Sequence, residues 1–225
     1  MAPLEHIFIG KNFGLKKDYD KARSTFERII QQYGDKPNLA AKSLMEIAVT
    51  YTQENNPAAV IRTYERIKRD YPFTDLGMRA PFTLARIEST ENPAISERQA
   101  FEKAIQYYRD LGIKHPNSPV SYKALYYIGS IHMYTKNWRP AVNAYSEILL
   151  TYTEKEYLTP VTLNLLLKTI NTISIAELND YEQPVRVYSK FIAKYPNHAA
   201  APIVERMIQG VKELKRKQLE EKALK

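Results

Sequence analysis

The feature that most constrains this chain is a stripe of side chains that recurs five times along it. Each copy steps by three, four, three and four residues, with a compact residue (Ala, Val or Pro) second and an aromatic third. Such steps place all five side chains on one face of an α-helix. The sequence therefore predicts five amphipathic helices that bury the same face. The stripes are Tyr19, Ala22, Phe26, Ile29, Tyr33; Pro57, Val60, Tyr64, Ile67, Tyr71; Phe101, Ala104, Tyr108, Leu111, His115; Trp138, Ala141, Tyr145, Ile148, Tyr152; and Tyr181, Pro184, Tyr188, Phe191, Tyr195.

A second stripe stands before three of these helices at a fixed distance. It consists of an aliphatic residue, then Gly or Ala, then a ring three positions on. Gly129 stands where a bulky side chain would hold a neighbouring helix away. Each pair of stripes therefore predicts a helical hairpin. The three copies are Ile9, Gly10, Phe13; Ile47, Ala48, Tyr51; and Ile128, Gly129, His132.

The third and fifth units are less regular. In the third unit, the first helix is predicted over about residues 78 to 89 and is followed by an inserted loop at 91–96. In the fifth unit, an apolar run from 158 to about 178 predicts a helix, but the sequence does not assign its register. Pro72, Pro116 and Pro196 follow second helices, where a missing N–H ends a helix cleanly. The chain is thus predicted to be one all-α domain, residues 1–225, with hairpins at 3–36, 41–74, 78–118, 122–155 and 158–198 and a capping helix at 200–224.

These two-helix units resemble tetratricopeptide repeats. The resemblance rests on an Ala, an aromatic residue four positions later, a large residue three positions after the aromatic, and a Pro eight positions after the aromatic. The segments 115–119 (HPNSP), 124–129 (ALYYIG) and 195–197 (YPN) are similar to the BamD/YbgF-like subgroup of bacterial envelope proteins. This resemblance implies a right-handed α-solenoid and a scaffold for envelope assembly. The chain departs from the subgroup because it has no Cys for lipid attachment and MAPLEHIFIG is not a signal peptide. The implied location is the periplasm or outer-membrane periphery if the chain is a piece of a longer protein, and otherwise the cytoplasm.

Composition excludes several kinds of chemistry. The chain has no Cys, so disulfides, thiolate catalysis and Cys-based zinc sites are excluded, and no apolar run is long enough to span a bilayer. His6, His115 and His132 occupy stripe positions, and His198 follows a helix end. No metal-binding His motif or glycine-rich phosphate loop occurs. The sequence predicts no catalytic residue, no cofactor and no metal.

The repeated aromatics have two interpretations. Phe26, Tyr64, Tyr108, Tyr145 and Tyr188 could form a stacking ladder for bases or sugars, or they could fill the space between successive hairpins. At a packing position of a repeat, the second is the prediction. Truncating one of them would then cost roughly 3–5 kcal/mol.

The residues free to bind a partner are those that the buried stripes leave over. In a stacked array the first helices line the concave surface, so their outward side chains are predicted to form a groove for an extended peptide or a partner helix. The alternative is that these residues are ordinary exposed surface, and the sequence leaves that choice open. Repeat proteins that bind the C-terminal tails of chaperones clamp the tail carboxylate with Lys and Asn. These residues are missing from the corresponding positions here, so a receptor of that kind is not predicted. The candidates are Met45, Val49, Thr52, Phe82, Arg86, Tyr126, Ser130, Met133 and Tyr134.

The formal charge of +8 supports a competing hypothesis, a nucleic-acid-associated repeat protein. Part of the excess lies in the tail at 212–217 (KELKRK), while the other Lys and Arg are interleaved with Asp and Glu. Nucleic acid is therefore the less favoured partner. Self-association through the terminal helix, about residues 203 to 219, is also left open.

Overall fold

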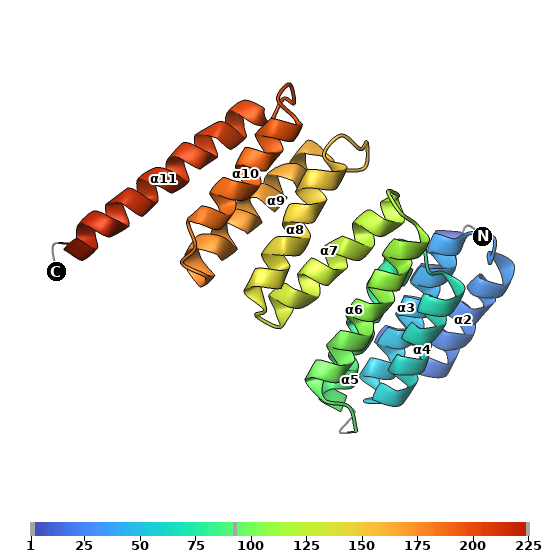
Figure 1. The fold of residues 1–225 in the computed structure, drawn as a ribbon. Helices are drawn as coiled ribbons and strands as arrows, with labels where there is room; N and C mark the ends of the chain where they lie inside the picture. Colours follow the sequence, from blue (N-terminus) through green and yellow to red (C-terminus); the bar gives the residue numbers. More distant parts are fainter. Residues whose placement is uncertain (1–2, 92–93, 224–225) are drawn as a thin grey trace. The chain divides into compact units, whose positions relative to one another are not determined.

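The computed structural model describes residues 3–91 and 94–223, and every regular element in these ranges is helical (Figure 1). The first helices of the five hairpins are α1 (Pro3–Leu15), α3 (Pro37–Gln53), α5 (Asp75–Glu91), α7 (Pro119–Tyr134) and α9 (Pro160–Thr172), which continues into a π-helical turn, η1 (Ile173–Glu177). The second helices are α2 (Tyr19–Gln32), α4 (Pro57–Asp70), α6 (Glu97–Lys114), α8 (Trp138–Tyr152) and α10 (Glu182–Lys194). The last helix is α11 (Ala201–Ala223). The all-α fold of successive hairpins is confirmed. The loop at 91–96 lies partly outside the described residues.

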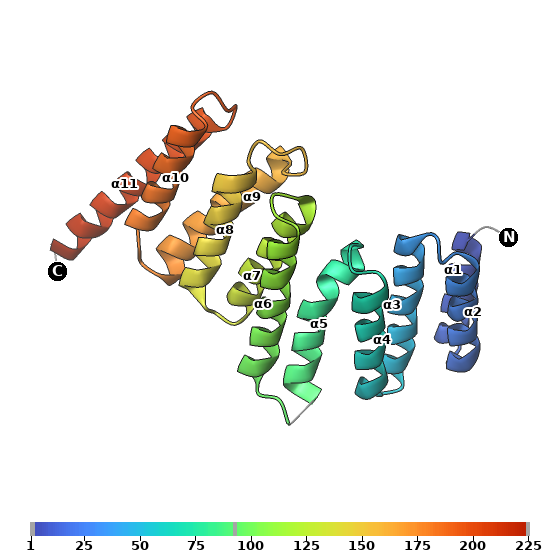
Figure 2. The same ribbon diagram turned by 45° about the vertical axis from the view of Figure 1, so that its right-hand side comes forward.

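The helices form two compact units, Met1–Asp110 and Leu111–Lys225. In unit 1, α1 packs on α2, α2 on α3, α3 on α4 and α4 on α5, while α3 also touches both α1 and α5 (Figure 2). In unit 2, α8 packs on α7, α9 and α10, and α10 packs on α11. A single domain over the whole chain stays a prediction.

A common turn joins the two helices of a hairpin. In three hairpins a backbone bond spans five residues and the residue before its donor is left-handed, which is the Schellman way of satisfying the last carbonyls of a helix. The bonds run from Asp18 N–H to Phe13 O (2.9 Å), from Asn56 N–H to Tyr51 O (2.9 Å) and from Asn137 N–H to His132 O (2.7 Å). The left-handed residues are Lys17 (φ 63°), Asn55 (φ 54°) and Lys136 (φ 55°).

The fifth hairpin closes over one more residue. Its bond runs from Asp180 N–H to Ser174 O (2.8 Å), a span of six, and the left-handed residue is Asn179 (φ 48°). The extra residue is absorbed in η1, where Leu178 N–H bonds Ile173 O five residues back. A single-turn π bulge is the usual way for a helix to hold an inserted residue.

Small residues let the hairpins close, as predicted at Gly129. A Cβ on Gly129 would lie 2.7 Å from Cε1 of Tyr145, and a Cβ on Gly10 would lie 2.6 Å from Cε1 of Phe26. Carbon atoms do not approach this closely without strain. In both hairpins the glycine therefore makes room for the repeated aromatic ring.

Four of the repeated aromatics are buried in the core, and the fifth, Tyr64, packs against it from the edge. Phe26, Tyr108, Tyr145 and Tyr188 are at most 4% exposed. Tyr64 is only partly buried, and its ring lies close enough to the Arg79 guanidinium for that charge to act on its pKa, although burial, which raises the pKa, dominates. The packing interpretation is thus confirmed, with the side chain fully buried at four positions and at the edge of the core at Tyr64.

In the third hairpin the buried aromatic supports a proline within a helix. Pro81 lies inside α5 and has no N–H to donate. The Tyr108 hydroxyl donates to Met78 O (2.7 Å) and accepts from Phe82 N–H (3.3 Å). In a regular α-helix Phe82 N–H and Met78 O would bond to each other. We infer that the hydroxyl bridges a helix turn that the proline loosens.

Candidate functional site

The first predicted residues lie on the first helices of unit 1. Val49 is 42% exposed, Thr52 and Arg86 are also exposed, and Met45 and Phe82 are partly buried. Because α3 touches α5, we expect these residues to share one surface, which we call the unit 1 face. Phe82 contributes to packing as well, since its ring centroid lies 6.2 Å from that of Phe101.

The unit 1 face continues onto α1, where it contains a cavity of about 210 Å³. The cavity lies among α1, α2 and α3, and its lining is mostly apolar. The lining residues are Gly10, Lys11, Gly14, Leu15, Phe26, Glu46, Val49, Thr50 and Gln53. Of these only Val49 was predicted. The missed signal is the repeat offset: Lys11 and Gly14 precede Ala22 by the same distances by which Val49 and Thr52 precede Val60.

The remaining predicted residues lie on α7 in unit 2. Met133 is 36% exposed, Tyr134 is 48% exposed, and Tyr126 and Ser130 are partly buried. We call this surface, with the part of α9 described below, the unit 2 face.

Three of these residues meet around the hydroxyl of the buried Tyr145. That hydroxyl donates to Met133 Sδ (3.3 Å) and lies 3.4 Å from Ser130 Oγ. The centroid of the Tyr145 ring lies 6.0 Å from the centroid of the Tyr126 ring. Burial raises the pKa of Tyr145 to about 12, against a smaller opposing effect of the Ser130 hydrogen bond. The core aromatic therefore fixes the positions of Tyr126, Ser130 and Met133 from beneath.

The part of the unit 2 face that lies on α9 was not predicted from the sequence. Val161 is 79% exposed and Leu165 is 54% exposed, and Lys168 continues the same helical stripe. The opposite side of α9 is buried in the core through Leu163, Leu166, Leu167 and Ile170. Since α8 packs on both α7 and α9, their uncovered sides both turn away from α8. The Thr162 side chain on α9 lies close enough to the Tyr122 hydroxyl on α7 to lower the pKa of Tyr122, although burial, which raises this pKa, dominates.

The charge of the unit 2 face is uniform in sign. Neither α7 nor α9 contains an Asp or Glu, and their formally charged residues are Lys123 and Lys168. Exposed aliphatic and aromatic side chains beside Lys168, on helices that contain no Asp or Glu, suit an apolar partner that carries some negative charge.

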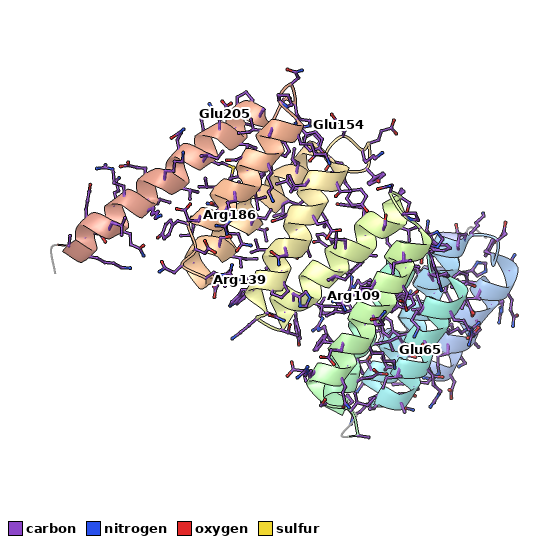
Figure 3. The ribbon with its side chains drawn as sticks, in the orientation of Figure 1. Glu65, Arg109, Arg139, Glu154, Arg186 and Glu205 are labelled. Carbon is purple, nitrogen blue, oxygen red and sulfur yellow. The ribbon has the colours of Figure 1, made fainter. Side chains whose placement is uncertain are left out.

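Elsewhere in unit 2 a cluster of ion pairs surrounds Asp180. Asp180 lies between Arg139 on α8 (3.1 Å) and Arg186 on α10 (4.0 Å), both labelled in Figure 3, and accepts from the N–H of Gln183 (2.9 Å). Burial alone would raise the pKa of Asp180, but the Gln183 N–H and the Arg139 guanidinium outweigh it and hold the pKa below its usual value.

Most cations of the basic tail at 212–217 are paired with carboxylates. Lys215 binds Glu182 (2.5 Å), and Arg216 binds both Glu213 (2.8 Å) and Glu220 (2.7 Å). Exposed pairs of this kind add little stability, but they reduce the positive field that the tail could offer to phosphates.

Among residues 3–91 and 94–223 no group of three or more His, Asp or Glu is placed to hold a metal ion. The described helices include none that combines the length and the apolar character required to traverse a bilayer.

The fold and these faces define a protein of repeated helical hairpins with uncovered first-helix surfaces. Residues 9–35 match a family model described as the tetratricopeptide repeat. A comparison with curated proteins found no match. Among solved structures, the chain is similar to a protein from Bacteroides ovatus ATCC 8483 that is provisionally described as a protein-binding protein, with 14% identity, a TM-score of 0.29, and coverage of 95% of this chain and 98% of that one. A similarity of this strength carries no argument about function, which has to come from the chain's own surface.

Proposed function

We propose that this chain is a non-enzymatic scaffold that binds a protein partner through its first-helix faces. The observation that carries the proposal is the unit 2 face, where Met133, Tyr134, Val161 and Leu165 are all at least 36% exposed. Apolar side chains grouped on adjacent helices mark interaction sites more often than scattered ones do. The tetratricopeptide repeat match at residues 9–35 supports the same class of function.

The partner is proposed to be a peptide or helix with apolar side chains and flanking carboxylates. Lys168 offers an exposed cation on α9, and α7 and α9 contain no carboxylate of their own. Such complementarity mainly selects the partner and speeds association.

The test compares Leu165→Lys with Leu214→Lys. Both leucines are exposed on helices, at 54% and 49%, but only Leu165 lies on the unit 2 face. Proteins cross-linked to the parent chain in native lysate would be identified by mass spectrometry, and circular dichroism would verify the folding of each variant. We expect Leu165→Lys to lose the partner and Leu214→Lys to keep it. Equal retention by both variants would remove the unit 2 face from the proposal.

The finer proposal is that the partner belongs to a bacterial envelope assembly. It is supported by the resemblance of the segments 115–119 and 124–129 to envelope repeat proteins. The complete gene tests it, because an envelope protein requires an export signal or a lipid-attachment Cys upstream of these residues. If the lysate experiment instead recovers RNA or DNA with a steep salt dependence, the nucleic-acid hypothesis replaces the scaffold.

A further inference from the structure

The cavity on the unit 1 face is large enough for a side chain of a partner. At about 210 Å³ it exceeds an apolar cavity of about 150 Å³, a size that binds benzene in another protein. A leucine, methionine or phenylalanine side chain is of that order. Because the cavity lies on the surface formed by first helices, a partner lying along that surface could insert such a side chain.

The two glycines of the cavity differ in what they do. Gly10 is explained by packing, since a Cβ there would meet the Phe26 ring. A Cβ on Gly14 would meet no atom within 4 Å, and the backbone of Gly14 does not have a positive φ. Gly14 is therefore required neither by a turn nor by a neighbouring group. Its effect is to leave the cavity open.

The polar groups of the cavity do not favour a charged occupant. Lys11 Nζ lies 2.8 Å from Glu46 Oε1, and the Glu46 side chain is only 9% exposed. The charges of the lining are thus already paired with each other. A charged side chain inserted beside them would lose its hydration without gaining a free counter-charge. An uncharged apolar side chain does not pay this desolvation cost on entering.

We propose that the cavity formed by Gly10, Gly14, Leu15, Phe26 and Val49 is an anchor pocket for one uncharged, bulky apolar side chain of a peptide bound on the unit 1 face. The pocket rests on the proposed function, because it names the feature of the partner that unit 1 selects. The pocket gives the unit 1 face a preference for peptides that carry an apolar residue at one position.

The test is a substitution that fills the pocket without disturbing the fold. Gly14→Leu places a side chain in the open space and replaces a helical glycine, so we expect the melting temperature to stay the same or rise. Gly210→Leu is the matched control, because Gly210 also lies in a helix with no atom within 4 Å of its Cβ position and lies outside the pocket.

The probe is a library of short random peptides displayed on phage and selected on the parent chain. We expect the binders of unit 1 to share an apolar residue at one position. Their synthetic forms should bind Gly14→Leu at least about tenfold more weakly than the parent, and Gly210→Leu with parental affinity. Replacing the shared apolar residue by Ala should weaken binding to the parent by a similar factor and have little effect on binding to Gly14→Leu.

Three results would overturn the proposal. Binders that are lost on Arg86→Ala but bind Gly14→Leu normally would leave unit 1 as a binding face and eliminate the pocket. A library without any binder would refute protein binding by unit 1 as well as the pocket. Concentration-dependent dimers of the parent that vanish only with Gly14→Leu would make a second copy of the chain the occupant.

Discussion

The bridge made by the Tyr108 hydroxyl leads to a quantitative prediction about Tyr108→Phe. The hydroxyl donates to Met78 O and accepts from Phe82 N–H, and Tyr108 and Met78 are at most 1% exposed. Removing it takes one hydrogen-bond partner from the buried Met78 carbonyl and one from the Phe82 amide. A buried group left unsatisfied costs roughly 1–3 kcal/mol, and the 3.3 Å bond is the weaker of the two. We expect a loss of about 2 kcal/mol in the free energy of unfolding.

The loss is expected to depend on Pro81. In Pro81→Ala the new N–H at residue 81 can bond Gly77 O. The turn is then no longer held open by the proline ring, so Phe82 N–H can bond Met78 O and the hydroxyl becomes less important. A double-mutant cycle over Tyr108→Phe and Pro81→Ala should therefore give a coupling of about 1 kcal/mol. Urea denaturation followed by circular dichroism measures the free energies, and hydrogen exchange reports the Phe82 amide directly. That amide should exchange faster in Tyr108→Phe.

Tyr188→Phe is the comparison without a proline. The Tyr188 hydroxyl donates to Leu167 O (2.6 Å) in a helix that has no internal proline near that bond. Its loss should be about 1 kcal/mol and insensitive to Pro81→Ala. If Tyr108→Phe costs the same in the parent and in Pro81→Ala, or leaves the exchange of Phe82 unchanged, the bridging role is refuted.

Three further predictions concern unit 2. Gly129→Ala should destabilise the chain by about 1–3 kcal/mol, because its Cβ would lie 2.7 Å from the Tyr145 ring. Gly210→Ala, where the added Cβ meets no atom within 4 Å, should stabilise the chain by about 0.5–1 kcal/mol. Urea denaturation that gives equal effects for the two variants would contradict this prediction. Asp180→Ala should cost about 1–2 kcal/mol at pH 7, through loss of the bonds to the first N–H groups of α10 and to Arg139. Because the pKa of Asp180 is lowered in the folded chain, this contribution is present above about pH 4 and is lost as the pH falls through the folded value, so the gap between parent and variant should narrow in acid. Burial raises the pKa of Tyr145 to about 12, which gives the opposite trend. Its contribution to the free energy of unfolding is present below about pH 10 and is lost as the pH rises from about 10 to 12, by at most about 2.7 kcal/mol. The free energy of unfolding of Tyr145→Phe should therefore fall less over that range than that of the parent.

The hairpins could be predicted because the information for them is local. A stripe such as Ala141, Tyr145 and Ile148 follows the helical period, and the observed α8 buries all three. The helix ends are local as well, since Pro37, Pro57, Pro119 and Pro160 begin helices, where their missing N–H is not needed.

The register of the fifth first-helix could not be predicted because its insertion leaves no local mark. The π turn contains the sequence ISIAE, which an ordinary helix could also contain. Only the six-residue closure to Ser174 shows that one residue has been added. Without it, Val161 and Leu165 could not be assigned to the exposed side of α9.

The predicted face residues share one property in the structure, since none of the nine is buried. The repeat offsets indicate which side of a first helix its partner helix covers, so exposure could be predicted. A cavity is different, because it depends on the space left among three helices. Gly14 contributes to it through the absence of a side chain, which periodicity of apolar residues does not detect.

The extra residue of the π turn also determines which chemistry α9 shows to solvent. One residue corresponds to about 100° of rotation about a helix axis. Deleting a residue within Ile173–Glu177 would return the hairpin to the five-residue closure and turn the preceding part of α9 by that angle relative to α10. Val161, Leu165 and Lys168 would leave the surface, and residues that now fill the core, such as Leu163 or Leu167, would move toward it. A one-residue length polymorphism, without any change in side-chain composition, could thus exchange a binding surface for a defective core.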